Sequence, residues 1–241
     1  MKKLLSILAL MLVALTANAQ SCPDNNHPHM IDLGLPSGTK WACCNMDTEH
    51  PENQSPTNYG SHFAWGETEV KDVYNAVTYQ YASGVDEDGD GRFDDRHETT
   101  GCLGVWQHLG NFTVDDYEDA YYDIAGTKYD VAHEKWGSSW VMPSPMQIRE
   151  LLYDCTYEWT EVNGVEGGRF TGPNGSSIFL PAAGYRWGGY PKNAGVVGYY
   201  WLSTQYPSCF DDAHELVILS GDADLALYER FHGMSVRPVS R

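Results

Sequence analysis

The chain has 241 residues, with 33 acidic against 15 basic side chains and a formal net charge of −18 at pH 7. A surface this acidic repels nucleic acid and anionic lipid, so we expect neither as a partner, whereas cations are attracted to it. Because 42% of the residues are hydrophobic, the chain can bury a core of its own.

Residues 1–19 predict a cleavable signal peptide. Lys2 and Lys3 provide the positive start, an apolar run extends from Leu4 to Leu15, and small residues precede the cut after Ala19. The apolar run is shorter than the ~20 residues that span a bilayer, and no later stretch is a candidate span. We therefore expect a mature chain that begins at Gln20, carries no integral membrane segment and works in the periplasm, at the cell surface or in the medium.

The cysteines favour the same compartment. Their even number in an exported chain predicts disulfide bonds, whereas the absence of C-x-x-C speaks against a thiol redox motif and a zinc knuckle. A lipoprotein with a modified Cys22 is the alternative, because the residues before it loosely resemble a lipobox. The six cysteines are Cys22, Cys43, Cys44, Cys102, Cys155 and Cys209.

The first half of the exported part contains few regular patterns. Residues 20–30 are polar and predict a disordered tail, in which we interpret the H-x-H of His27 and His29 as incidental. Short strands broken by Gly and Pro are predicted from Ile31 onward. Residues 67–128 are acidic, rich in tyrosine and without periodicity, so we expect a long insertion, the kind of segment that carries function.

One helix is well signalled. Ser144 can cap it, Pro145 suits its first turn and Gln147 completes a capping box, after which Ile148, Leu151 and Leu152 form one apolar stripe. A second helix is predicted over 116–135, broken at Gly126.

The last third predicts antiparallel strands. Asn163-Gly164, between two alternating segments, is the strongest hairpin signal of the chain. The predicted strands cover 157–162, 165–171, 177–180, 199–204, 216–219, 225–228 and 235–239. Short strands with one or two helices predict an α+β fold rather than a parallel α/β one.

Several phrases, taken in order, resemble the Fibrobacter succinogenes major paralogous domain, a family of exported bacterial proteins. The resemblance covers residues 31–241, which we therefore expect to form one domain. The matching phrases are residues 32–42 (DLGLPSGTKWA), 59–68 (YGSHFAWGET), 130–132 (DVA), 136–137 (WG), 140–143 (WVMP), 172–186 (GPNGSSIFLPAAGYR), 198–201 (GYYW) and 233–239 (GMSVRPV).

That family is similar to the C-type-lectin-like fold, in the branch that includes formylglycine-generating enzymes. The resemblance implies a compact α+β domain with neighbouring chain ends and a long variable loop region. It places Cys44 and Cys155 in or beside shared phrases, and we expect these two to pair. It also implies that the tryptophans in shared phrases belong to the core, namely Trp41, Trp65, Trp136, Trp140 and Trp201.

Residues 86–94, DEDGDGRFD, predict a calcium loop. Carboxylates at positions 1, 3 and 5 and glycine at position 6 match the first part of an EF-hand-like loop, although position 12 is His97 rather than the bidentate Glu. A solvated acidic loop is the alternative. The expected calcium ligands are Asp86, Asp88, Asp90, the backbone carbonyl of Arg92, Asp94, and Glu98 or Asp95 in place of the missing Glu.

For ligand binding the best candidates are Trp187 and Tyr190, on a glycine-rich turn where aromatic rings can stack on sugars. Neither metalloprotease, nucleophile-elbow, phosphate-loop nor dinucleotide motifs occur, and Glu67 lies in a shared phrase and is expected to be structural. We expect a non-catalytic binding module for a glycan or a cell-surface protein. The alternatives are a formylglycine-generating type of enzyme, which needs a cysteine pair, and a structural module of a surface assembly.

Overall fold

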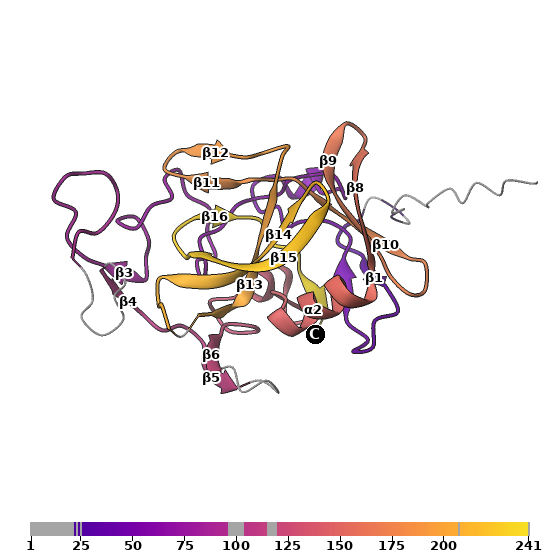
Figure 1. Cartoon of the computed structure of the whole chain (residues 1–241), viewed down its shortest axis with the longest axis horizontal. Helices are drawn as coiled ribbons and strands as arrows, with labels where there is room; N and C mark the ends of the chain where they lie inside the picture. The colour runs from indigo at the N-terminus through magenta and orange to yellow at the C-terminus, as the bar shows by residue number, and fades with distance from the viewer. Residues whose placement is uncertain are drawn as a thin grey trace, which may run out of the picture.

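The computed structural model describes residues 22, 24, 26–95, 104–114, 120–206 and 208–240, and in these the backbone is mostly strand with little helix. The strands form several short antiparallel sheets (Figure 1). An α+β class rich in β structure is therefore confirmed.

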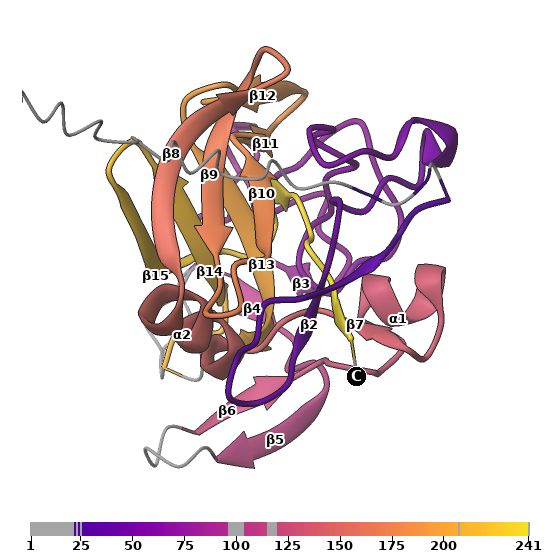
Figure 2. The ribbon, with the colours of Figure 1, turned by 90° about the vertical axis from the view of Figure 1, so that its right-hand side faces the viewer.

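Two sheets lie face to face and enclose the main core. Figure 2 shows β8, β9 and β10 alongside β13, β14 and β15, with α2 across one end. Phe170 and Ile178 from the first sheet and Leu216 from the second are buried in one apolar cluster. The first sheet has the order β10 (Ser177–Pro181), β9 (Val165–Thr171), β8 (Thr156–Val162); the second has the order β15 (Asp222–Glu229), β14 (Asp212–Leu219), β13 (Gly198–Gln205), β6 (Ala120–Asp123), β5 (Asn111–Val114).

The predicted hairpin at Asn163-Gly164 is confirmed. Val162 pairs with Val165, so only two residues connect β8 and β9. Asn163 has φ 52° and Gly164 φ 81°, the two positive values that a twist-matched hairpin turn requires. The strand that follows, β10, and the hairpin of β14 and β15 are also where the sequence predicts them.

The capped helix is confirmed as α2 (Pro145–Asp154). The Ser144 hydroxyl accepts from the Gln147 amide, and the Gln147 side chain accepts from the Ser144 amide. Ile148 and Leu151 are buried against the core. The other helix, α1 (Val131–Trp136), begins at Asp130, whose carboxylate accepts from the amides of Ala132 and His133.

The two ends of the described chain meet in one sheet, as the resemblance implies. Val239 pairs with both Trp41 and Val141, so the last strand lies between an early strand and a middle one. The order is β1 (Met30–Asp32), β2 (Lys40–Ala42), β17 (Val239–Ser240), β7 (Trp140–Val141).

The remaining strands border the loop-rich side of the molecule. They are the sheet of β12 (Tyr190–Lys192), β11 (Tyr185–Trp187) and β16 (Gly233–Met234), and the pair β3 (Ala82–Ser83) and β4 (Val105–Trp106); a short 3-10 turn covers Pro51–Asn53. The predicted core tryptophans Trp41, Trp65, Trp140 and Trp201 are buried, and Trp136 packs at the edge of the same core.

Four expectations are wrong in part. Residues 120–123 form strand β6 instead of helix, because they pair with β5 and β13; among the described residues of the predicted range helix begins at Val131, and 116–119 lie outside the described residues. The predicted strand 235–239 is instead two short strands around an irregular segment. The ordered chain begins before Ile31, since Met30 pairs with Ala42. Cys44 and Cys155 are free thiols and form no disulfide.

The expected insertion at 67–128 also contributes to the core. Tyr74, Tyr79, Phe93 and Trp106 bury their rings in a separate aromatic cluster, so this segment is partly a folded layer and not only a loop. Among the described residues no helix has both the length and the apolar character to span a bilayer.

A buried arginine offers a direct test of this architecture. The Arg237 side chain is 1% exposed and donates to Asn45 Oδ1 (2.8 Å), to the Ala42 carbonyl (3.1 Å) and to the Phe179 carbonyl (2.9 Å). Arg237→Met leaves three buried acceptors unsatisfied, so we expect urea denaturation to show a loss of more than about 3 kcal/mol. The exposed Lys40→Met is the control and should stay within about 0.5 kcal/mol. Equal stability of the two variants would contradict the role given to Arg237.

Candidate functional site

The β11–β12 hairpin presents the two aromatic residues singled out in the sequence. Gly188 and Gly189 form its turn, and Gly188 has φ 57°, a conformation that side chains disfavour. Trp187 pairs directly with Tyr190, so both rings project from the same face of the hairpin. Trp187 is 37% exposed and Tyr190 is 72% exposed, which leaves a pair of rings open to a ligand.

Further rings support this pair from below. Tyr185, on the same strand face as Trp187, lies 5.1 Å from the ring of Tyr199 and 5.5 Å from that of Tyr228. His232 packs against Tyr185, Trp187 and Tyr228. Trp187 therefore rests against a packed aromatic layer through His232, whereas Tyr190 stands free of it.

Arg92 joins the hairpin to the acidic loop. Its guanidinium carbon lies 5.4 Å from the centre of the Trp187 ring, and its Nη1 lies 3.2 Å from Glu229 Oε1 on β15. The Lys192 ammonium is a second cation near Trp187, at 5.9 Å. Two segments almost a hundred positions apart in the sequence thus contribute to one surface.

Three of the predicted calcium ligands are brought together. One carboxylate oxygen each from Asp86, Asp88 and Asp90 lie within 4.8 Å of one another. Calcium binds oxygens at about 2.4 Å, so oxygens on opposite sides of one ion are about 4.8 Å apart and this spacing fits the ion. Gly91 has φ 86°, the bend that the sequence assigns to it.

The loop backbone is shaped by the same carboxylates. Asp86 accepts from the amides of Gly89 (2.9 Å) and Gly91 (3.2 Å), and Asp90 Oδ1 accepts from the amide of Arg92 (2.8 Å). Asp94 is not part of this group, and its carboxylate accepts from the Glu87 amide at 2.6 Å. Asp95 likewise accepts from the Val85 amide.

The two remaining predicted ligands are Arg92, through its backbone carbonyl, and Glu98. The Arg92 side chain extends away from the loop toward Glu229 and Trp187, which leaves only its backbone carbonyl for an ion. Glu98 lies outside the described residues.

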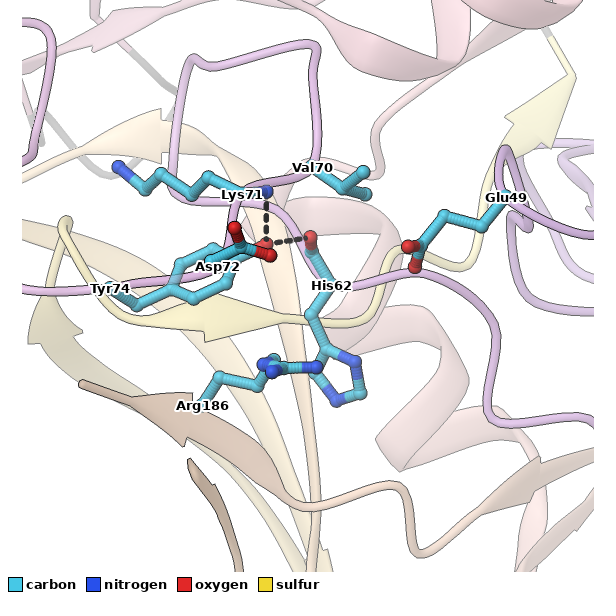
Figure 3. A pocket seen from close by; sticks show the side chains of 7 residues that line it. All are labelled: Glu49, His62, Val70, Lys71, Asp72, Tyr74 and Arg186. Atoms are coloured by element: carbon cyan, nitrogen blue, oxygen red, sulfur yellow. Dashed lines mark hydrogen bonds between the residues drawn. The ribbon is translucent and has the colours of Figure 1, made fainter. Parts of the chain in front are cut away.

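A polar pocket of about 190 Å³ lies on the opposite side of the hairpin (Figure 3). Arg186 reaches it from between Tyr185 and Trp187, and its guanidinium stacks over the ring of Tyr74 at 5.8 Å. The lining residues carry both charges: Glu49, His62, Val70, Lys71, Asp72, Tyr74 and Arg186.

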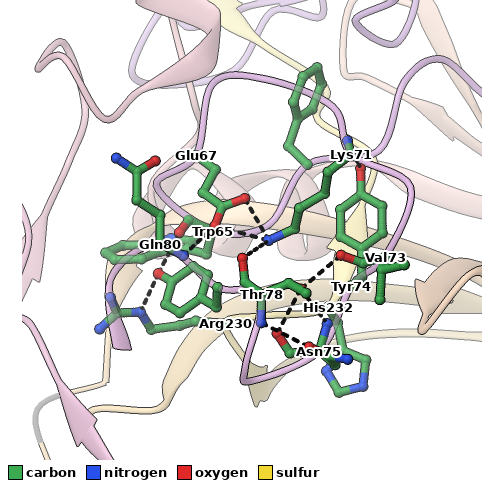
Figure 4. A network of polar contacts seen from close by, with 12 residues as sticks. Trp65, Glu67, Lys71, Val73, Tyr74, Asn75, Thr78, Gln80, Arg230 and His232 are labelled. Carbon is green, nitrogen blue, oxygen red and sulfur yellow. Dashed lines mark hydrogen bonds and ion pairs between the residues drawn. The ribbon is translucent and has the colours of Figure 1, made fainter. Parts of the chain in front are cut away.

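The wall of this pocket is fixed by the network in Figure 4. Lys71 Nζ forms an ion pair with the buried Glu67 (2.7 Å) and donates to the Thr78 carbonyl (3.2 Å). Glu67 also accepts from the Gln80 amide at 2.7 Å. Glu67 therefore shapes the loop that carries Lys71 and Tyr74, which agrees with the structural role expected for it.

Three titratable groups of the pocket are desolvated. Burial, together with the nearby positive charge of Arg186, lowers the pKa of His62 to about 4, and burial lowers the pKa of Lys71 despite its ion pair with Glu67. Burial raises the pKa of Tyr74 to about 12. No cysteine of the described residues lines the pocket.

Sequence reasoning did not identify the pocket. Its residues come from four separate stretches of the chain, at Glu49, His62, residues 70–74 and Arg186. Tyr74 joins two of them, because its backbone amide and carbonyl both bond to Gly188 in the hairpin turn. Only a long-range pairing of this kind reveals that Arg186 and Lys71 line the same pocket.

Comparison of the chain with models of protein families, with curated proteins and with solved structures finds no match.

Glu215 provides a test of the layer beneath the hairpin. It lies on β14, is 1% exposed, and its charge adds to the rise that burial causes in the pKa of Tyr199 and of Tyr228. Burial and the charge of Asp212 raise the pKa of Glu215 to about 8. Among the described residues, its Oε2 has no hydrogen-bond partner.

Because the folded state holds this proton more tightly than the unfolded state, stability should fall as pH rises from about 4.5 toward 8. Asp212, with its pKa raised to about 7, adds to the same trend. Glu215→Gln should reduce the slope by up to about 1.4 kcal/mol per pH unit in urea denaturations across this range. An unchanged slope in the variant would show that Glu215 is ionised in the folded protein.

Proposed function

We propose that this protein is an exported, non-catalytic binding module that holds a glycan on the β11–β12 hairpin, beside a loop ordered by calcium. The observation that carries the proposal is the stacking of Arg92, from the acidic loop, on Trp187 of the hairpin at 5.4 Å. Ordering of the loop by calcium would therefore also fix the position of the Trp187 ring, which would contact the ligand.

The chemistry of the surface supports a sugar as the ligand. One face of a pyranose ring is an apolar patch of C–H groups, and its rim carries hydroxyls. The exposed rings of Trp187 and Tyr190 match the patch, and the Lys192 ammonium near Trp187 matches the hydroxyls. The packed rings below reduce the entropy that binding would otherwise cost.

The finer fold assignment forms part of the same proposal. Pairing of β17 with β2, which brings the chain ends together, supports a C-type-lectin-like domain of the Fibrobacter succinogenes major paralogous type. The formylglycine-generating alternative gains no support from the polar pocket, whose lining lacks the cysteine pair that such an enzyme needs. A cell-surface protein or a surface assembly would use the same exposed hairpin.

Calcium binding is tested by calorimetric titration of the full protein. We expect a dissociation constant on the order of 10⁻⁴ M, because the loop lacks the bidentate Glu, and stabilisation of about 2.7 kcal/mol at a hundredfold excess of calcium over that constant. Asp88→Ala/Asp90→Ala should abolish both effects.

The matched control is Asp222→Ala/Asp224→Ala, which removes two exposed aspartates of identical spacing from β15 and should bind calcium normally. If millimolar calcium produces neither a heat of binding nor a shift in melting temperature, the loop is a solvated acidic segment that binds no calcium. Equal binding by both double variants would place the site elsewhere.

Glycan binding is tested by screening the protein on an oligosaccharide array with and without calcium. Trp187→Ala/Tyr190→Ala should weaken binding to retained glycans at least tenfold, since aromatic anchors dominate such contacts. Tyr153→Ala, an 83% exposed aromatic on α2, is the control and should bind normally. Retention of no glycan, or equal binding by the double variant, would contradict the proposal; capture of a surface protein through the hairpin instead would favour the alternative ligand.

A further inference from the structure

A second group of metal-binding side chains lies far from the acidic loop, at the beginning of the described chain. One ligand atom each from Cys22, His27, His29 and Cys43 lie within 4.8 Å of one another. Cys43 is buried and the other three are half-buried, so the group is enclosed by the fold and not gathered on an open surface.

The strand register brings the group together. Met30 pairs with Ala42 at the end of the β1–β2 ladder, and the Cys43 amide donates to the His29 carbonyl at 3.0 Å, which continues the ladder by one step. His29 therefore lies opposite Cys43 although 14 positions separate them. The chain before His29 then turns so that His27 also faces the same sulfur.

The distances fit a tetrahedral centre. His27 Nδ1 lies 3.1 Å and His29 Nδ1 3.7 Å from Cys43 Sγ. With zinc–sulfur bonds of about 2.3 Å and zinc–nitrogen bonds of about 2.0 Å, a tetrahedral ion separates such a nitrogen and sulfur by about 3.5 Å. The two observed separations bracket this value, so small movements would admit one ion.

Two contacts outside the group have the form expected around a metal. His29 directs Nδ1 toward Cys43, and its opposite nitrogen, Nε2, lies 3.0 Å from Asp24 Oδ1. A carboxylate on the far nitrogen fixes the tautomer that leaves the near nitrogen free to ligate. The His29 amide also donates to Cys43 Sγ at 3.1 Å, which stabilises negative charge on that sulfur.

We propose that Cys22, His27, His29 and Cys43 form a closed zinc site that fastens the N-terminal segment to the first sheet. Two thiolates and two imidazoles in a tetrahedral arrangement suit zinc rather than the oxygen-preferring calcium or magnesium. Four protein ligands leave no open position, so the role is structural. The site is independent of the glycan and calcium proposals.

The test is zinc binding by the full chain, isolated under reducing conditions and assayed by elemental analysis and by visible absorption of the cobalt(II)-substituted protein. We expect one zinc per chain and the intense d–d bands of a tetrahedral cobalt–thiolate centre. His27→Ala should weaken zinc binding at least tenfold, and Asp24→Asn by about 10–100-fold without removing a ligand. Both changes affect partly exposed side chains, so folding should survive and can be checked by circular dichroism.

Three controls separate this site from others. His50→Ala changes an exposed histidine whose imidazole pairs only with Glu52 among the described residues, and Cys155→Ser removes a thiol outside the group; both should bind zinc normally. Asp88→Ala/Asp90→Ala should lose calcium and keep zinc. Failure to bind zinc, zinc binding unaffected by His27→Ala, a Cys22–Cys43 disulfide that persists under reduction, or a lipid on Cys22 would each overturn the proposal.

Discussion

Two buried arginines tie separate segments of the fold together by donating to their backbone carbonyls. Arg230 is fully buried and donates to the carbonyls of Gln107 and Phe210 and to the Tyr79 hydroxyl, while its guanidinium lies 4.8 Å from the Trp65 ring. Arg237 donates to three further acceptors, which lie between the sheet that contains β2 and strand β10. A guanidinium carries five N–H donors in a fixed plane, so one arginine can donate hydrogen bonds to acceptors from several chain segments at once.

Arg230 also helps to position the acidic loop beside the β11–β12 hairpin. Arg230 follows β15, whose Glu229 pairs with Arg92, so the core arginine and the acidic loop are attached to the same strand end. Whereas the arginines donate to carbonyls, the buried carboxylate of Asp130 accepts from backbone amides. These are the amides of Gly126, Ala132, His133 and Met142. The rigid part of the molecule is therefore a set of polar junctions between short elements, and the hairpin projects from it.

The features predicted correctly are those set by residues that lie close together in the sequence. The Ser144–Gln147 capping box, the Asn163-Gly164 turn and the clustering of Asp86, Asp88 and Asp90 depend on residues a few positions apart, and each is present. The failures involve distant partners. Residues 120–123 join a sheet because β13 pairs with them, and His29 meets Cys43 through strand register, so the H-x-H that looked incidental in the sequence faces a buried thiol. Periodicity within one segment contains no information about such pairings.

In the proposed function, the acidic loop and the aromatic hairpin respond to calcium as one surface through Arg92. Hydrogen exchange measured by mass spectrometry, with and without calcium, tests it most directly. We expect slower exchange on calcium addition both in peptides covering 86–95 and in peptides covering 185–192, and loss of the hairpin response alone in Arg92→Ala. Protection confined to the loop in the unaltered protein, or no protection in either segment, would contradict it.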